Sequence, residues 1–260
     1  MAGKDKRAFG VEPGTKGFLV SCFRGREAAC VSECYQLLDQ YYDKFYGSCC
    51  AEGNAKKRDF STLIEDELEA ELAEMRKKKD KTFLSLSMGD LQCLAFLRLG
   101  GKTAEAAQVK PSAFAVQMFE SLLQEGKAKA RYSQRIIPID YSCYANLTDF
   151  SKLAKVCIEE HFPVVSASGA TTTYCLAIES RFNNSLSKEE IIQAFTQMVP
   201  SAYKVQFKVP DLTVVVQVFK NIVGFSVVPK YDALKRFNVQ QCVRSSESAP
   251  LLLPPVEKAE

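Results

Sequence analysis

The sequence has few of the residues from which common active sites are built. It contains one histidine, His161, among 260 residues. A single histidine argues against a Ser-His-Asp triad, an HExxH metal site and a histidine-rich zinc site. His161 falls on the apolar stripe in the last turn of a predicted helix. We therefore predict a packing or helix-end role for it, with a chemical role as the alternative.

Cysteine is present, but not in a pattern that binds metal or forms a disulfide framework. Ten cysteines make up about 4% of the chain, against roughly 8–10% in disulfide scaffolds. No Cys-x-x-Cys occurs; Cys30 and Cys34 lie one helical turn apart, and Cys49 and Cys50 are adjacent. This spacing does not supply the four ligands of a zinc site, so we predict core thiols and no metal.

Glycine motifs for phosphate binding and nucleophilic catalysis are missing as well. The sequence has no Gly-x-Gly-x-x-Gly and no Gly-x-Ser-x-Gly. Residues 100–103 (Gly-Gly-Lys-Thr) resemble the end of a phosphate-binding loop, but Phe96 stands where that loop needs its first glycine. The sequence therefore predicts no catalytic residues and no cofactor.

Long hydrophobic runs are also absent. The densest apolar stretch, residues 212–228, is interrupted by Lys220 and Asn221, so no membrane span is expected. The charged N-terminus, residues 1–7, is not followed by the apolar segment of a secretory signal. We predict a protein with reduced thiols in the nucleus, nucleolus or cytosol.

The composition is that of a soluble globular protein, with 47% hydrophobic and 25% charged residues. At about 150 residues per domain, 260 residues predict two compact units. Hydrophobic periodicity in the first half predicts an α+β sandwich of the split βαβ kind. Its expected elements are strands at 16–22, 92–99 and 134–139, helices at 27–46, 64–75 and 112–124, and a loop at 47–58.

The second half has its own set of elements. A capping box at residues 187–190 (Ser-Lys-Glu-Glu) predicts a helix start. The other expected elements are a helix at 149–161 and strands at 172–180, 204–208, 212–219 and 222–228. We place the boundary between the units near 139–148. The predicted organisation is a polar tail (1–15), a first domain (16–140) with an insertion near 47–90, a second domain (141–244) and a disordered tail (245–260).

Positive charge is concentrated near the C-terminus. Between Pro200 and Arg244 the chain has seven lysines and arginines but only two aspartates, whereas acidic residues gather at 65–74. Such segregation favours a polyanion-binding face on the second domain. The alternative is an ordinary solvated surface.

Several segments of the second half, in this order and spacing, resemble a THUMP domain. They are Ser180-Arg-Phe-Asn-Asn-Ser185, the capped helix at Ser187, residues 204–211 (Lys-Val-Gln-Phe-Lys-Val-Pro-Asp) and the strand at 214–218. The first half is similar to the ferredoxin-like domain that usually precedes this module. The resemblance covers residues 11–244 and implies an α/β THUMP domain behind a ferredoxin-like domain.

THUMP domains are RNA-binding modules of tRNA-modifying proteins, and the chain resembles the members that stand alone. The sequence ends about 15 residues after the module, which leaves no room for a fused enzyme. The resemblance implies a non-catalytic adaptor that presents tRNA, of the serine and leucine species, to a separate RNA cytidine acetyltransferase forming N4-acetylcytidine. Two alternatives stay open: a protein-interaction scaffold, and an RNA-modifying enzyme with an unrecognised active site. The oligomeric state is not predicted.

The residues expected to contact RNA lie in the second domain. Lysine and arginine would bind phosphates, and Arg181, Asn183 and Asn184 would add hydrogen bonds. The alternative for Asn183 and Asn184 is a turn between strand and helix. The complete predicted set is Arg181, Asn183, Asn184, Lys204, Lys208, Lys220, Lys230, Lys235 and Arg236.

Overall fold

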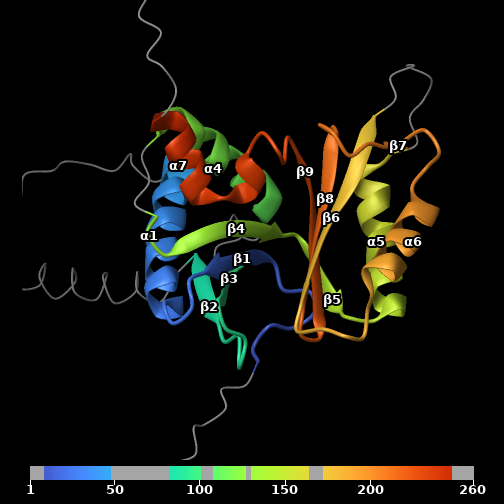
Figure 1. Ribbon diagram of the computed structural model, residues 1–260, viewed down its shortest axis with the longest axis horizontal. Coiled ribbons are helices and arrows are strands. Elements are labelled where there is room, and N and C mark those ends of the chain that lie inside the picture. Colours follow the sequence, from blue (N-terminus) through green and yellow to red (C-terminus); the bar gives the residue numbers. More distant parts are fainter. Residues whose placement is uncertain (1–8, 48–81, 101–107, 127–129, 164–171, 248–260) are drawn as a thin grey trace, which may run out of the picture.

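The computed structural model describes residues 9–47, 82–100, 108–126, 130–163 and 172–247. Its strands form one sheet of four strands and one of five, and helices cover both sheets (Figure 1). The predicted helix at 64–75 and residues 101–103 of the glycine-rich segment lie outside the described residues.

The first sheet has the ferredoxin-like arrangement, as the sequence predicted. Its strands lie in the order β2-β3-β1-β4 and all pair antiparallel, with α1 and α4 as the connecting helices of a βαββαβ unit. The elements are β1 (Gly17–Cys22), α1 (Glu27–Tyr46), β2 (Phe83–Leu86), β3 (Leu94–Leu99), α4 (Pro111–Glu125) and β4 (Ser133–Ile139).

Local sequence explains where these elements begin and end. Pro111 occupies the first turn of α4, where its missing N–H costs nothing, and Gly126 ends the helix in the left-handed conformation with φ 64°. Gly17 starts β1 where the strand passes very close to β3, since a Cβ there would stand 2.1 Å from the Leu97 carbonyl oxygen. Only glycine fits at that position.

The second sheet is mixed, with the strand order β5-β9-β8-β6-β7. Strand β6 pairs parallel with both β7 and β8, and β9 pairs antiparallel with β8 and β5. Helices α5 and α6 cover one face of the sheet (Figure 1). The elements are β5 (Tyr141–Tyr144), α5 (Leu147–His161), β6 (Thr173–Arg181), α6 (Lys188–Met198), β7 (Lys204–Val205), β8 (Leu212–Phe219) and β9 (Ile222–Pro229).

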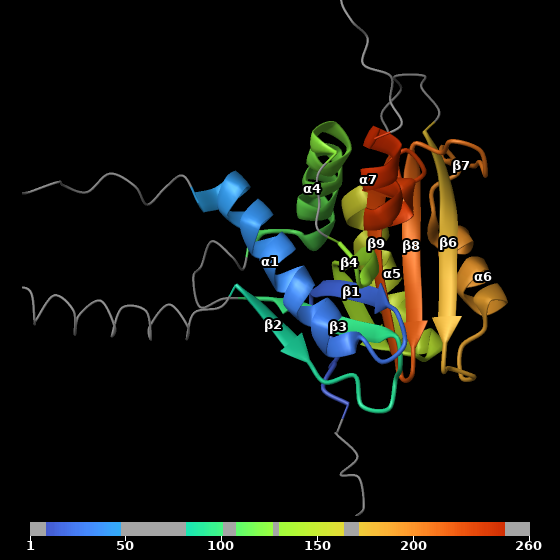
Figure 2. The ribbon, with the colours of Figure 1, turned by 60° about the vertical axis from the view of Figure 1, so that its left-hand side comes forward.

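The other face of the second sheet packs on the first unit, and the C-terminal segment closes that contact. After β9 the chain forms a short 3-10 helix, η3 (Lys235–Phe237), and α7 (Val239–Glu247), which lies beside α4 (Figure 2). Phe237 is fully buried, with its ring centroid 5.1 Å from that of Phe119 in α4. Residues 231–242 thus contribute to the core of the first unit, although the sequence placed them in the second domain.

Four of the described elements were not predicted from the sequence: β2, β5, η3 and α7. Each is shorter than the stretch of about 11–18 residues over which hydrophobic periodicity is recognised in a sequence. Strand β7 is shorter than the predicted 204–208 because the chain turns away after Val205.

The predicted limits of the units change accordingly. Strand β2 belongs to the first sheet, so the insertion expected at 47–90 ends before Phe83. Part of the N-terminal tail is ordered, since Phe9 bridges Met88 and Val11 is buried. Helix α7 continues to Glu247, beyond the predicted start of the C-terminal tail at 245, and residues 248–260 lie outside the described chain.

Candidate nucleic-acid interface

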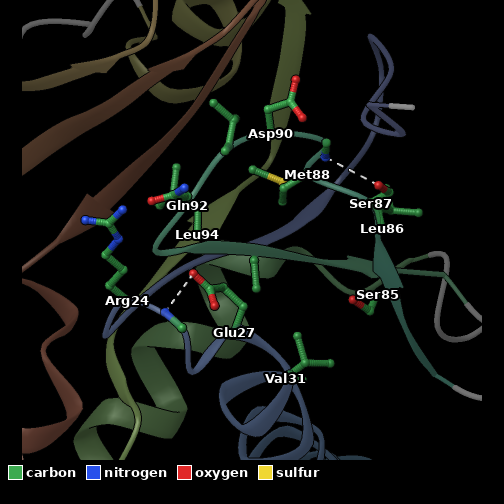
Figure 3. A pocket seen from close by; sticks show the side chains of 15 residues that line it. Arg24, Glu27, Val31, Ser85, Leu86, Ser87, Met88, Asp90, Gln92 and Leu94 are labelled. Carbon is green, nitrogen blue, oxygen red and sulfur yellow. Dashed lines mark hydrogen bonds between the residues drawn. The ribbon is translucent and has the colours of Figure 1, made fainter. Parts of the chain in front are cut away.

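A surface hollow of about 890 Å³ lies between the start of α1 and the loop joining β2 to β3 (Figure 3). Its walls carry few charges: Arg24, Glu27 and Asp90. The Glu27 carboxylate accepts hydrogen bonds from the backbone N–H groups of Gly25 (3.3 Å) and Cys93 (3.0 Å), which lower its pKa. Glu27 therefore fastens the start of α1 to the start of β3, which is a structural role.

Another hollow is a polar groove of about 410 Å³ where the two units meet, and we call it the junction groove. It is lined by hydrogen-bonding side chains from β1, β4, β6 and the C-terminal segment. The lining residues are Ser21, Gln134, Arg135, Arg181, Asn238 and Gln240. A groove lined by both units, with two arginines and three amides, suits a polar or anionic ligand.

A shared carboxylate fixes the two arginines of the junction groove. Arg135 of β4 lies 2.6 Å from one oxygen of Glu179, and Arg181 lies 3.1 Å from the other. Both arginine side chains keep about a third of their surface exposed. Two positive charges against one negative leave the trio net positive. The ion pair between Arg135 of β4 and Glu179 of β6, and the second ion pair within β6, hold the arginines at the opening.

Among the predicted residues, Arg181 lies in the groove, whereas the Asn183 side chain is hydrogen-bonded within the protein. The Asn183 side-chain oxygen accepts hydrogen bonds from the backbone N–H groups of Ser185 and Leu186, both at 3.1 Å. Its amide nitrogen donates to the Ser185 hydroxyl (3.0 Å) and to the Lys220 carbonyl. These bonds make a turn between β6 and α6, the alternative that the sequence left open. Asn184 is exposed beside this turn.

The predicted lysines do not form one face. Lys220 follows β8 at the end of the sheet where Arg181 lies, and its ammonium group stands 4.9 Å from the centre of the Phe9 ring. Lys204, Lys208 and Lys230 lie at the opposite end of the sheet, near the start of β6 and the end of β9. The eight residues of β8 separate these ends by roughly 26 Å.

Two other predicted basic residues pair with acidic neighbours. Lys230 lies 3.1 Å from Glu120 of α4, and Arg236 lies 2.8 Å from Asp232. The hydrogen bond that Arg236 donates to the Asp232 carboxylate raises the pKa of Arg236. Lys235, the remaining member of the set, is half-buried in η3.

Sequence reasoning missed the part of the groove that the first unit and the C-terminal segment contribute. Gln134 and Arg135 begin a strand in the first unit, and Asn238 and Gln240 lie in the polar C-terminal segment. The one available signal was a charged residue, Arg135, within an otherwise apolar strand (Gln-Arg-Ile-Ile-Pro-Ile). Nothing local in the sequence indicates that this strand faces β6.

The described residues offer no assembled catalytic centre. The His161 ring is half-buried with Nε2 at 3.2 Å from the Tyr141 hydroxyl, and burial lowers its pKa. Burial also raises the pKa of the Cys22 thiol to about 12, and Cys30 and Cys34 place their sulfurs 3.9 Å apart in the core. Within the described ranges, no three metal-ligating side chains come together, and no helix has the length and apolar character needed to span a membrane.

The second sheet and its helices are those of a known domain. Residues 144–228, which run from the end of β5 to the end of β9, match the THUMP domain. These residues therefore form a THUMP domain within the chain. The match ends before Tyr231, where the chain returns to the first unit.

Relatives match the chain over most of its length. "THUMP domain-containing protein 1" from Bos taurus is 28% identical over 257 residues, which cover 94% of this chain and 68% of the bovine protein. "tRNA acetyltransferase TAN1" from Saccharomyces cerevisiae is 28% identical over 259 residues, covering 90% of this chain and 87% of the yeast protein. The similarity thus includes the first unit as well as the THUMP domain.

Solved structures are more distant. PH1313 from Pyrococcus horikoshii matches 67% of this chain and 53% of its own, with 13% identity and a TM-score of 0.37. A 4-thiouridine synthetase in complex with RNA and ATP matches 83% of this chain and 42% of its own, with 10% identity and a TM-score of 0.36. The chain spans about half of these structures or less, and TM-scores this low assign it neither a function nor a site.

Proposed function

We propose that the chain binds tRNA and takes part in tRNA modification, by presenting tRNA to a separate RNA cytidine acetyltransferase that forms N4-acetylcytidine. The observation that carries the proposal is the junction groove, where Arg135 and Arg181 from two different sheets are held side by side next to a THUMP domain. The name of the yeast relative, a tRNA acetyltransferase, supports acetylation as the modification. Serine and leucine tRNAs are the proposed substrates.

The groove suits the backbone of folded RNA. A guanidinium group can bind a phosphate with two parallel hydrogen bonds, and amide side chains bind sugar hydroxyls and base edges. Arg135 and Arg181 supply the charge, and Gln134 supplies an amide. Asn238 and Gln240 also line the groove, while the Asn238 side-chain oxygen and the Gln240 amide nitrogen bond to the backbone. Contacts of this kind position an RNA without reading a long sequence, which is what an adaptor requires.

We assign the chemical step to the separate acetyltransferase. Acetyl transfer to the cytidine amine needs a group that removes a proton, and His161, Cys22 and Cys143 are engaged in packing. His161 is half-buried against Tyr141, and burial raises the pKa of the Cys22 and Cys143 thiols to about 12, which keeps them protonated near neutral pH. An adaptor contributes positioning, which lowers a barrier without chemistry of its own.

Neutralising the groove tests the binding proposal. In Arg135→Gln/Arg181→Gln, two phosphate contacts are lost, so the slope of log affinity against log salt should fall by about two and the Kd for tRNA should rise about tenfold or more. The measurement is a filter-binding titration at several salt concentrations. Lys152→Gln is the control. Lys152 is exposed on α5, a helix that covers the face of the second sheet turned away from the first unit.

The control variant should keep the slope and Kd of the wild type. A double variant that binds tRNA as the wild type does, at every salt concentration, would move the RNA contact away from the junction groove.

A further inference from the structure

Residues 204–211, which comprise β7 and its connection to β8 and which we call the 204–211 loop, expose two large apolar side chains. Phe207 is 83% exposed and Val209 is 82% exposed, more than any other large hydrophobic residue in the described chain. Leaving a phenylalanine ring in water is unfavourable, so its exposure calls for a ligand or an explanation in the fold.

The fold holds this loop in one shape. The backbone N–H groups of Lys204 and Gln206 donate to the carbonyls of Thr172 (3.2 Å) and Tyr174 (2.9 Å) beside β6. The Gln206 side-chain amide then donates across the loop to the carbonyl of Lys208 at 2.6 Å. These bonds fasten the first half of the loop on both sides of Phe207.

The second half of the loop is fastened by Asp211. Its carboxylate accepts hydrogen bonds from the backbone N–H and the hydroxyl of Thr173, both at 2.8 Å. Val209 has φ 49°, a left-handed conformation that is costly for a β-branched residue and persists only where the surroundings impose it. Phe207 is thus displayed by a constrained loop.

The charged residues nearest to Phe207 in the sequence are both lysines. Lys204 and Lys208 flank it and are both exposed, and no aspartate or glutamate occurs in the sequence between Glu190 and Asp211. Asp211 itself is engaged by Thr173, whose hydrogen bonds lower the pKa of the carboxylate. An exposed aromatic ring between two lysines combines a stacking surface with phosphate contacts.

We propose that the 204–211 loop is a second RNA contact, in which Phe207 stacks on an unpaired base and Lys204 and Lys208 bind the flanking phosphates. Aromatic side chains in basic surroundings bind single-stranded nucleic acid in this way, since every base has a face on which a ring can stack. The proposal rests on the proposed function and extends it by naming single-stranded RNA as the ligand of this loop.

The loop and the junction groove lie at opposite ends of β6. Lys204 pairs with Thr173 at the start of the strand, while Arg181 ends it, so the two sites are separated by roughly 26 Å. One RNA molecule could therefore reach both. A protein partner suits the loop less well, because the centres of protein interfaces are depleted in charge and especially in lysine.

The absence of tryptophan from the chain makes a direct test possible. Phe207→Trp keeps the aromatic face and introduces a single fluorophore at the proposed contact. A short unstructured RNA should quench its emission in a saturable, salt-dependent way, whereas Phe23→Trp, a half-exposed position in the first unit, should show no quenching. Phe207→Ala should weaken binding of the same RNA about tenfold, as expected for loss of one stacked base.

Two comparisons make the test specific. Val209→Ala alters an equally exposed but non-aromatic side chain on the same loop and should bind like the wild type. A blunt-ended RNA duplex should bind Phe207→Ala and the wild type equally. If RNA does not quench Phe207→Trp and Phe207→Ala binds the RNA with unchanged affinity, the stacking proposal is overturned. If the wild-type protein still binds tRNA in that case, the proposed function stands.

A third outcome would also overturn the proposal. If Phe207→Ala bound single-stranded RNA normally but lost its association with the purified acetyltransferase, the loop would be a protein contact.

Discussion

Asp140 is a buried carboxylate at the point where the chain passes from the first unit to the second. It stands between β4 and β5, where the chain leaves the first sheet for the second, and it is only 5% exposed. One carboxylate oxygen accepts a hydrogen bond from the backbone N–H of Ser112 (2.9 Å) in the first turn of α4. The other has no hydrogen-bond partner among the described residues, and burial raises the pKa of the group.

Replacing Asp140 should therefore be costly in one variant and tolerated in another. Asp140→Ala leaves the buried Ser112 N–H without an acceptor, so the free energy of unfolding should fall by about 1–3 kcal/mol. Asp140→Asn keeps an acceptor oxygen and should lose less. Urea unfolding at pH 7 measures both, and equal losses in the two variants would contradict the capping role.

The pH dependence of Asp140→Asn follows from the same burial. Because the pKa of Asp140 is raised in the folded protein, the folded state holds this proton more tightly than the unfolded state, whose pKa is about 3.9. The group stabilises the fold below that value, and its contribution is lost as pH rises through the raised pKa. Across this range the wild type should lose stability relative to Asp140→Asn.

At the residue scale the sequence identified chemical character better than location. Arg181 was predicted as a contact and lies in the junction groove, but its partner Arg135 was not, because their proximity depends on two strands 46 positions apart in the chain. Asn183 was correctly given a turn as its alternative, since asparagine favours such turns.

At the scale of elements, the C-terminal segment decides how the units combine. The ring of Phe237 is fully buried between Phe119 of α4 and Tyr231, with centroid distances of 5.1 and 5.5 Å. Helix α7 follows at once and contacts α4 and β4. A segment that follows the THUMP domain in sequence thus completes the core of the first unit.

Phe237→Ala should accordingly destabilise the whole protein. Removing a fully buried phenylalanine leaves a cavity, and the free energy of unfolding should fall by about 3–5 kcal/mol. Phe207→Ala is the same substitution at an exposed site and should change stability by less than about 0.5 kcal/mol. Thermal or urea unfolding followed by circular dichroism makes the comparison; similar losses in both variants would exclude η3 from the core.

Long elements with strong periodicity were predicted within a few residues, and several short elements were missed. Helix α1 repeats buried residues at Cys30, Cys34, Leu37 and Tyr41, and the capping box of α6 is present as predicted. Strands β2 and β5 are four residues long and are stabilised by pairing with distant strands, which a local pattern does not reveal.

At the scale of the whole molecule, the two units form a single support for the two proposed RNA contacts. The second sheet buries one face under α5 and α6 and packs the other against the first unit, so the junction groove and the 204–211 loop are held at fixed positions along β6. A fixed spacing lets two modest contacts act together at high effective concentration. We infer that the proposed adaptor orients its tRNA through this rigidity.

Acetylation of tRNA in a purified system tests the adaptor proposal most directly. The assay combines tRNA and acetyl-coenzyme A with this protein, with an RNA cytidine acetyltransferase, or with both, and measures N4-acetylcytidine by mass spectrometry of nucleosides. Positioning without chemistry predicts product on tRNA when both proteins are present, at a rate well above that of the acetyltransferase alone, and a reduced rate with Arg135→Gln/Arg181→Gln. N4-acetylcytidine formed by this protein and acetyl-coenzyme A alone would contradict the account.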